Sequence, residues 1–238
     1  ATYGSAPSFN ITSVEYLTNG GQVLTGLSAV GGSGNSFQYS DGAGGTVDFT
    51  LGAANPLNSV GGNLRVGNYG ATATSLTVGG GNFSGTPTVV GALTVTPLAR
   101  TVTGVTAQNK TYDRTNSATF TGGIIDRLAN DAVSVVGTGV TATFADKNVG
   151  NGKAVSLFGF TLTGADAANY RLIQPADVLA NITVPTLTIT GVTALNKVYD
   201  QTRTALLTGG VINTLLGDDA ILVTTGATGL FADADVAD

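Results

Sequence analysis

Apolar residues alternate with threonine, serine or another small residue in many short stretches of the chain. This period of two is typical of β-strands that bury one face, and Val, Ile, Thr and Phe favour strands. Glycine-containing pairs such as Gly-Gly, Asn-Gly and Gly-Asp separate the stretches and predict the turns of antiparallel sheets. The clearest stretches are "LTVTP" (93–97), "AVSVV" (132–136), "VTATF" (140–144) and "AVSLFGFTLTG" (154–164). We therefore predict an all-β fold, in which only "IIDRLAND" (124–131) has the composition of a helical turn.

The alternation changes phase at Gly159. Val155 and Leu157 share one parity, whereas Phe160 and Leu162 share the other. A β-bulge inserts one extra residue into a strand, and glycine tolerates the backbone that this requires. We therefore predict a bulge at Gly159 that keeps all four apolar side chains on the buried face.

The chain repeats itself with a displacement of 87 residues. "TVTGVTAQNKTYDRTNSATFTGGIIDRL" from residue 101 aligns without a gap with "TITGVTALNKVYDQTRTALLTGGVINTL" from residue 188. Roughly half of about fifty aligned positions are identical, which is more than shared composition produces. A module of about 90 residues has the size of a small β-sandwich domain.

The repeat divides the chain into three modules. The first module begins with "TYGSAP", which is similar to "TYDRTN" in the middle module, and both modules end in an apolar and threonine-rich strand before a proline. Proline lacks the N–H that a central strand needs, so Pro97 and Pro185 mark the boundaries. We predict a first module (1–97) with an inserted or divergent segment at about 17–58, a middle module (98–185), and a last module (186–238) that stops short of a full period.

One polar heptad, "NKTYDRT" (109–115), recurs as "NKVYDQT" (196–202). A tyrosine at its centre can bury its ring and keep its hydroxyl at the rim of the core, and the lysine stem can lie over that ring. The aspartate can cap the turn by accepting the N–H two residues further on. The heptad holds no base, nucleophile or metal-ligand set, so we interpret it as a structural corner. Its residues are Asn109, Lys110, Tyr112 and Asp113 in the middle module, and Asn196, Lys197, Tyr199 and Asp200 in the last module.

A second corner is predicted in "DAANYRL" (166–172). The order Asp-x-Ala-x-Tyr resembles the tyrosine corner of immunoglobulin domains, where the tyrosine hydroxyl bonds nearby backbone. We assign this part to Tyr170, and the matching part in the first module to Tyr69 of "VGNYGAT" (66–72).

"NKTYDRT…GADAANYRLIQP" and "NKVYDQT" resemble the YDG repeats of large bacterial haemagglutinin-like surface adhesins, which are named for a Tyr-Asp-Gly triplet. Arg114 and Gln201 replace that glycine, so we expect no positive φ at this place. "TYGSAP…RVGNYGAT…GALTVTP" resembles the related MBG repeats. The resemblance implies tandem immunoglobulin-like β-sandwich modules that form an elongated rod. It also implies a secreted, cell-surface adhesin exported by two-partner secretion, which acts in attachment or biofilm formation.

Composition excludes several classes of protein. The net charge is −5 and Lys and Arg are scattered, whereas nucleic-acid binding needs clustered cations. No apolar run is long enough to span a membrane, and 42% apolar with 11% charged residues is too apolar for a disordered chain. The absence of cysteine and histidine removes disulfides, thiolates and the commonest general base and metal ligand. We predict no catalytic residue and no cofactor. The chain shows no signal peptide, and we interpret it as a fragment of a longer protein.

The sequence offers residues for one metal site and for one covalent cross-link, and each has a simpler interpretation. Calcium prefers hard oxygen ligands, which "GDDA" and "DADVAD" supply through Asp218, Asp219, Asp233 and Asp235. The middle module has "DKNVGN" at the matching place, with Lys147 opposite Ala234, so solvated turn carboxylates are the simpler interpretation. A Lys–Asn isopeptide bond at Lys110 or Lys197 needs a buried acid, and the only glutamate is Glu15.

Two surface functions remain open. The segment "VGGSGNSFQYSDGAGG" (30–45) could be an exposed loop whose Phe37 and Tyr39 stack on a sugar, although their alternation fits a strand that faces the core better. Asn-x-Ser/Thr triplets, which are glycosylation acceptors, begin at Asn10, Asn82, Asn109 and Asn181. We expect a stalk segment whose partners are neighbouring modules. The alternative is a carbohydrate-binding module for host or matrix glycans.

Overall fold

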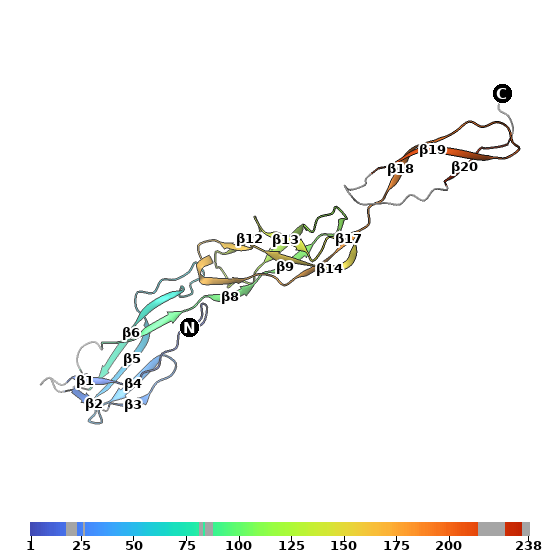
Figure 1. Cartoon of the computed structure of the whole chain (residues 1–238). Coiled ribbons are helices and arrows are strands. Elements are labelled where there is room, and N and C mark those ends of the chain that lie inside the picture. Colours follow the sequence, from blue (N-terminus) through green and yellow to red (C-terminus); the bar gives the residue numbers. More distant parts are fainter. Residues whose placement is uncertain (18–22, 26, 81–82, 84–87, 214–226, 235–238) are drawn as a thin grey trace. The chain divides into compact units, whose positions relative to one another are not determined.

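The computed structural model describes residues 1–17, 23–25, 27–80, 83, 88–213 and 227–234 (Figure 1). In these residues the regular structure is β-strand, apart from one short 3₁₀ helix, η1 (Ala167–Asn169). The all-β prediction is confirmed. The strands are β1 (Glu15–Leu17), β2 (Val23–Thr25), β3 (Ser28–Gly31), β4 (Ser36–Ser40), β5 (Thr46–Ala53), β6 (Gly67–Gly79), β7 (Ala92–Val95), β8 (Leu98–Thr101), β9 (Thr103–Ala107), β10 (Lys110–Thr111), β11 (Phe120–Ile124), β12 (Ser134–Val136), β13 (Thr141–Phe144), β14 (Gly150–Phe158), β15 (Thr161–Thr163), β16 (Tyr170–Ile173), β17 (Val178–Thr183), β18 (Thr188–Ala194), β19 (Thr204–Asn213) and β20 (Thr228–Leu230).

The chain forms two compact units, which we describe separately. The middle module contributes to both, so the units do not follow the 87-residue repeat. Unit 1 contains Ala1–Val105, Gly122–Val140 and Gly159–Pro175, and unit 2 contains Thr106–Thr121, Thr141–Phe158 and Ala176–Asp238.

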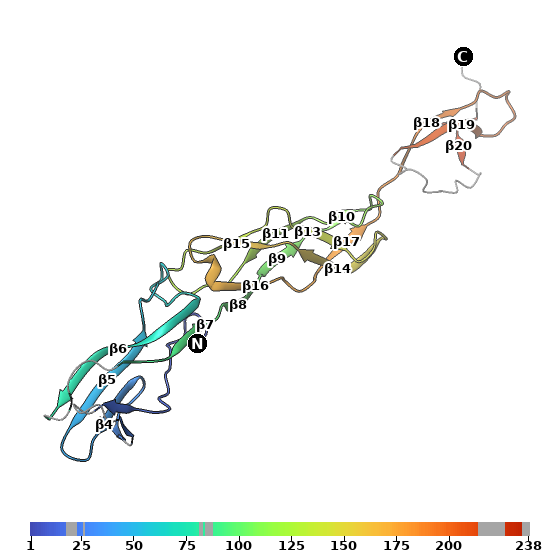
Figure 2. The same ribbon diagram turned by 60° about the vertical axis from the view of Figure 1, so that its left-hand side comes forward.

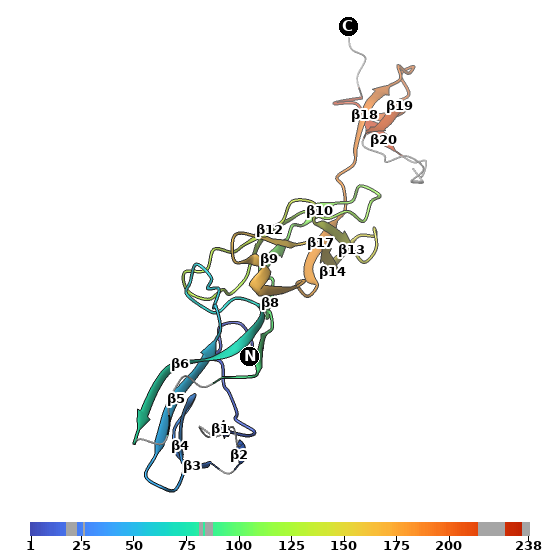
Figure 3. The ribbon, with the colours of Figure 1, turned by 90° about the vertical axis from the view of Figure 1, so that its left-hand side faces the viewer.

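The largest sheet of unit 1 has the antiparallel order β3-β4-β5-β6-β7, and β4, β5 and β6 run side by side in Figure 2 and Figure 3. Tyr39, Phe49 and Leu51 are buried on one face of this sheet, and Phe37 packs against them. The rings of Tyr39 and Phe49 stack with their centroids 6.1 Å apart. Tyr39 is therefore a core residue, and its ring is not available for stacking on a sugar.

A second core of unit 1 combines residues of the first and middle modules. Tyr3, Tyr69, Val95, Val133 and Tyr170 are buried in it. Small sheets surround this core: β8 pairs in parallel with β16, β12 is antiparallel to β15, and β9 pairs with β11.

Unit 2 contains a sheet of order β10-β17-β14-β13. Phe144, Val155 and Leu157 are buried on β13 and β14, as the alternation along these strands predicts. Ala180 and Ile182 are buried on β17. β10 runs parallel to β17, with Lys110 opposite Ile182. The sheet β18-β19-β20 of the last module buries Ala205, while Ile189 and Val211 are exposed.

The Gly-Gly doublets at Gly122 and Gly209 do not form the predicted turns. They lie inside β11 and β19, and both glycines of each doublet have a positive φ. A Cβ at Gly122 would lie 2.0 Å from the Gly104 carbonyl oxygen, and one at Gly209 would lie 2.5 Å from that of Gly191. Glycine is needed here because two backbones approach closely within a sheet.

The phase change at Gly159 marks a change of sheet and not a bulge within one strand. β14, which pairs with β13, ends at Phe158, and β15, which pairs with β12, begins at Thr161. Val155, Leu157 and Phe160 are buried and Leu162 is half-buried, as predicted. The Gln174 Oε1 accepts from the Gly159 and Phe160 N–H groups at 3.1 and 3.0 Å, and its Nε2 donates to the Phe160 carbonyl at 3.0 Å.

The segment 124–131 is not helical. After β11 the chain is irregular and turns at Ala129 and Asn130, where Asn130 has a φ of 65°. The Leu128 N–H donates to the Tyr170 hydroxyl, and the Arg127 guanidinium donates to the Asp131 carbonyl. These side-chain partners satisfy backbone groups that a helical turn would use. Among the described residues, no helix is long and apolar enough to cross a membrane.

Candidate functional site

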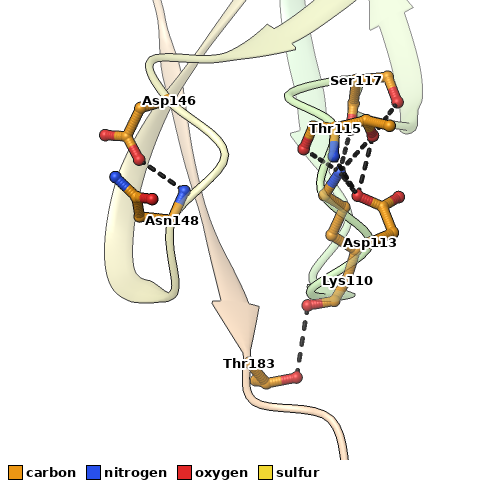
Figure 4. Close-up of polar contacts among 7 residues, drawn as sticks. All are labelled: Lys110, Asp113, Thr115, Ser117, Asp146, Asn148 and Thr183. Atoms are coloured by element: carbon orange, nitrogen blue, oxygen red, sulfur yellow. Dashed lines mark hydrogen bonds and ion pairs between the residues drawn. The ribbon is translucent and has the colours of Figure 1, made fainter. Parts of the chain in front are cut away.

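The heptad of the middle module is a turn held together by the Lys110 ammonium (Figure 4). Lys110 Nζ lies 2.7 Å from Asp113 Oδ1, and it also donates to the Thr115 hydroxyl at 3.0 Å. Two backbone carbonyls, those of Thr115 at 2.8 Å and Ser117 at 2.9 Å, accept from the same group. Nζ also lies 5.6 Å from the centroid of the buried Phe144 ring, in the geometry of a cation–π contact.

The aspartate caps the turn as predicted. Asp113 Oδ1 accepts the Thr115 N–H at 2.9 Å and the Thr115 hydroxyl at 2.8 Å. The hydrogen bond from Lys110, followed by that from the Thr115 N–H, lowers the pKa of Asp113 from 3.8 to about 2.

The last module repeats this arrangement with its own residues. Lys197 Nζ lies 2.5 Å from Asp200 Oδ1, 2.6 Å from the Thr202 carbonyl and 5.8 Å from the Phe231 ring centroid. The Thr202 N–H donates to Asp200 Oδ1 at 2.9 Å. The hydrogen bond from Lys197, and then those from Thr202, lower the pKa of Asp200 to about 2. We call these two arrangements the lysine ties. Their aromatic partner is a phenylalanine, Phe144 at the end of β13 or Phe231 directly after β20, and not the predicted tyrosine of the heptad.

The expectation that the turn needs no positive φ is wrong. Arg114 has a φ of 68° and Gln201 a φ of 62°. Both are therefore in the left-handed region where side chains with a Cβ are strained. The glycine of a Tyr-Asp-Gly triplet fits this backbone, and here an arginine and a glutamine adopt it.

The other heptad residues differ between the two copies. The Asn109 Oδ1 accepts the Asn181 N–H at 2.7 Å, and the Tyr112 N–H donates to the Thr183 carbonyl at 2.9 Å, so both attach the heptad to β17. Tyr112 is half-buried, but Tyr199 is 55% exposed. Asn196, the counterpart of Asn109, is exposed.

The two predicted tyrosine corners are different structures. The Tyr69 hydroxyl donates to the Arg65 carbonyl four residues upstream at 2.9 Å, as a tyrosine corner predicts. The Tyr170 hydroxyl contacts distant groups instead, at 2.5 Å from Asp131 Oδ2 and 2.9 Å from the Leu128 N–H. Tyr170 therefore belongs to a separate polar cluster.

This cluster, which we call the junction cluster, is the feature that the sequence analysis missed. Asp131, Asp166 and Asn169 are buried in the second core of unit 1, and Ser59 lies beside them. The Tyr3 hydroxyl donates to Asp131 Oδ2 at 2.6 Å, and Ser59 Oγ donates to Asp131 Oδ1 at 3.1 Å. The only sequence signal is a pair of aspartates that each precede an alanine, in "LANDA" and "GADAAN".

Burial and hydrogen bonding act in opposite directions on this cluster. Burial raises the pKa of the Asp131 carboxyl, but the hydrogen bonds from Tyr170, Tyr3 and other donors lower it by more, so that it lies below its ordinary value. Burial, and then the bond to the Asp131 carboxylate, raise the pKa of the Tyr3 hydroxyl. The cluster therefore holds an ionised carboxylate between neutral hydroxyl donors.

The chemistry of the described residues is structural. An ammonium whose N–H groups all point at protein acceptors has no lone pair to act as base or nucleophile. The Nζ of Lys110 faces Asp113, Thr115 and Ser117, while the Asn109 side chain bonds elsewhere, so the isopeptide geometry is not formed. Within the part of the chain that the structure describes, no three acidic residues are close enough to hold a metal ion. Of the four aspartates considered for calcium, Asp233 is described, and Asp218, Asp219 and Asp235 lie outside the described residues.

The remaining predicted surface sites are the glycosylation acceptors and the turn aspartate that matches Asp233. Asn10 is exposed, and Asn82 lies outside the described residues. The Asn109 and Asn181 side chains both accept backbone N–H bonds, so glycosylation there would compete with the fold. Asp146 is the residue of the middle module that matches Asp233, and its Oδ1 lies 2.6 Å from Lys153 Nζ. The same oxygen accepts the Asn148 N–H (Figure 4). The hydrogen bond from Lys153, and then that from Asn148, lower the pKa of the Asp146 carboxyl.

Comparison with known families assigns the repeat. The family described as the YDG domain matches residues 96–178 and 183–238, which include both lysine ties. The chain belongs to the YDG domain family. The middle and last modules are thus its two YDG repeats. No curated protein and no solved structure matches the chain.

Proposed function

We propose that this chain is a segment of the extracellular stalk of a bacterial surface adhesin, built from tandem immunoglobulin-like sandwich modules. The observation that carries the proposal is the repeated lysine tie. In both YDG repeats the polar groups of the motif are directed at other groups of the same turn, at 2.5 to 3.0 Å. A motif of this kind fixes a turn and leaves no reactive group for a substrate.

The junction cluster supports the same proposal. It connects segments of the first module and of the first YDG repeat through buried polar bonds inside unit 1. Buried hydrogen bonds between adjacent modules resist separation because each broken bond leaves an unsatisfied polar group. Such a property suits a spacer that holds a distal adhesive region away from the cell in attachment or biofilm formation, after export by two-partner secretion.

Carbohydrate binding is the alternative function. Its two candidate aromatic residues, Phe37 and Tyr39, pack in the core around Phe49. The exposed face of the same strands is polar, with Gln38 bonded to Asp48 at 2.6 Å and Ser36 to Thr50 at 3.0 Å. The packing of the aromatic residues favours the stalk over the glycan-binding module.

Single-molecule force spectroscopy tests the proposal. The chain is stretched between its ends, and a stalk segment should show discrete unfolding events at forces that exceed those of non-mechanical domains. The variant Lys110→Met should lower the force of one event, while the exposed-surface variant Thr77→Ala should not. A featureless extension, combined with saturable binding on a glycan array, would replace the stalk by the carbohydrate-binding alternative.

A further inference from the structure

The strand pair β9–β11 of the first YDG repeat is equivalent to the pair β18–β19 of the second. At a displacement of 87 residues, Val102, directly before β9, matches Ile189, and Ile124 matches Val211. Ile124 and Val211 are both 64% exposed, so their surroundings do not differ between the repeats. By contrast, Val102 is 2% exposed and Ile189 is 57% exposed. One apolar place on the strand pair is therefore covered in the first repeat and open in the second.

Residues 159–175 cover this place in the first repeat. A Cβ at Gly123 would lie 2.8 Å from Phe160 Cε1 and 3.4 Å from its Cζ, so the edge of the ring lies directly on the glycine. The Phe160 side chain is buried there. The Val102 N–H donates to the Ile173 carbonyl at 2.9 Å. One continuous segment therefore supplies both a ring over Gly123 and a backbone acceptor for Val102.

The equivalent glycine of the second repeat, Gly210, lies between two exposed apolar side chains. A Cβ at Gly210 would lie 3.3 Å from Ile189 Cγ2 and 3.4 Å from Val192 Cγ2. Both of these side chains are exposed. We call Ile189, Val192 and Gly210 the apolar notch. It has the glycine and the flanking apolar residues that receive the Phe160 ring in the first repeat.

The phenylalanines of this chain are committed to other places. Residues 186–238 contain one phenylalanine, Phe231, and its ring lies beside Lys197 Nζ in the second lysine tie. The Phe160 ring of a second copy of the chain is already buried against its own Gly123. The occupant that fits the notch is therefore a segment whose phenylalanine is not yet packed in a repeat.

We propose that the apolar notch is a docking site for the complementary half of a YDG repeat, a segment of the type that residues 159–175 form. Its phenylalanine occupies the place above Gly210, as Phe160 does above Gly123. An aromatic ring that fills a preformed apolar site is the kind of anchor that dominates the energy of an interface. The inference concerns an interaction surface, and its test has the same meaning whether or not the chain is a stalk.

The first arm of the test is a titration of the whole chain, labelled with nitrogen-15, with a synthetic peptide of residues 159–175. The Ile189, Val192 and Gly210 amides should shift and saturate, while the amides of β9 and β11 keep their positions. The same peptide with Phe160→Ala should bind at least about 10-fold more weakly, because it lacks the anchor. Equal binding of the two peptides, no saturable shift, or shifts confined to β9 and β11 would overturn the proposal.

The second arm places the site on the chain. Val192→Thr puts a hydroxyl into the notch and keeps a β-branched side chain, so it should weaken binding of the peptide at least about fivefold. Val211→Thr is the matched control, because its counterpart Ile124 stays exposed in the first repeat, and it should change binding by less than about twofold. Equal effects of the two variants would contradict the site.

Light scattering of the chain without peptide tests the choice of occupant. The chain should be monomeric, because its own Phe160 is buried. A dimer that Val192→Thr dissociates would show that a second copy occupies the notch, and would overturn the proposal.

Discussion

Removing the ammonium of the middle lysine tie tests the structural role of the heptad most simply. The variant Lys110→Met keeps the apolar stem against Phe144 and deletes the charge. It removes the bonds to Asp113, to the Thr115 carbonyl and hydroxyl, and to the Ser117 carbonyl. We therefore expect a local loss of stability without a change of fold.

The magnitude follows from the exposure of these groups. The ion pair with the half-exposed Asp113 contributes about 0.5 kcal/mol, because water screens exposed pairs. The two carbonyl bonds contribute about 0.5–1 kcal/mol each, since exposed carbonyls regain water when the lysine is lost. The cation–π contact with Phe144 adds about 0.5 kcal/mol. The sum is about 2–3 kcal/mol, and its lower end corresponds to about a 30-fold change in an equilibrium constant.

Native-state hydrogen exchange is the appropriate assay, because a chain with two units does not unfold as one two-state system. The Ala118 and Phe144 amides, which pair β13 with the segment after the turn, should lose about 30-fold in protection. Lys197→Met should have a smaller effect on the last module, because its side chain is 25% exposed, compared with 17% for Lys110. A loss below about threefold in Lys110→Met would refute the interpretation of the tie as a stabilising feature.

Three further predictions concern backbone strain, pH and the sheet change. Gln201→Gly should raise the melting temperature of the last module and Gln201→Val should lower it, because the φ of 62° costs a residue with a Cβ about 1 kcal/mol; calorimetry with equal midpoints for both variants would contradict this. The carboxyls of Asp113 and Asp200, with folded pKa values of about 2 against 3.8 unfolded, contribute stability that is complete above pH 4 and is lost as the pH falls toward 2. Urea midpoints should therefore fall across this window, and fall less in Lys110→Met/Lys197→Met; a flat wild-type profile would count against the ties. Gln174→Leu should destabilise the break at Gly159 by about 2–3 kcal/mol, because it removes the acceptor of two N–H groups and the donor to one carbonyl, and unchanged exchange of the Phe160 amide would show that the side chain is dispensable.

Local patterns of the sequence predicted the strands and part of the heptad. Alternation predicted the buried positions Val155, Leu157 and Phe160, and the spacing of Asp113 and Thr115 predicted the cap of the turn. Strand burial and the cap of the turn depend on residues that are close along the chain, so they can be predicted from a single sequence. The 87-residue repeat added the equivalence of Lys110 and Lys197, which the two ties reproduce.

Long-range contacts were beyond the same analysis. The Lys110 ring partner is Phe144, 34 residues away, and Asp131 bonds Tyr3 from 128 residues away. The alternation of apolar and polar residues does not indicate which loop will contact which buried aspartate. The glycine doublets illustrate the other failure, because a positive φ serves a turn and a close backbone approach equally well, and only the position of Gly104 opposite Gly122 distinguishes them.

Small-angle X-ray scattering of the whole chain, with and without a chelator, tests the stalk most directly. A compact globule of 238 residues has a radius of gyration of about 18 Å. A tandem stalk should have a clearly larger radius of gyration and the cross-section of one module, and a chelator should change neither. A radius near the compact value would contradict the tandem stalk, and extension only in the presence of calcium would assign the spacing of the modules to a metal site instead.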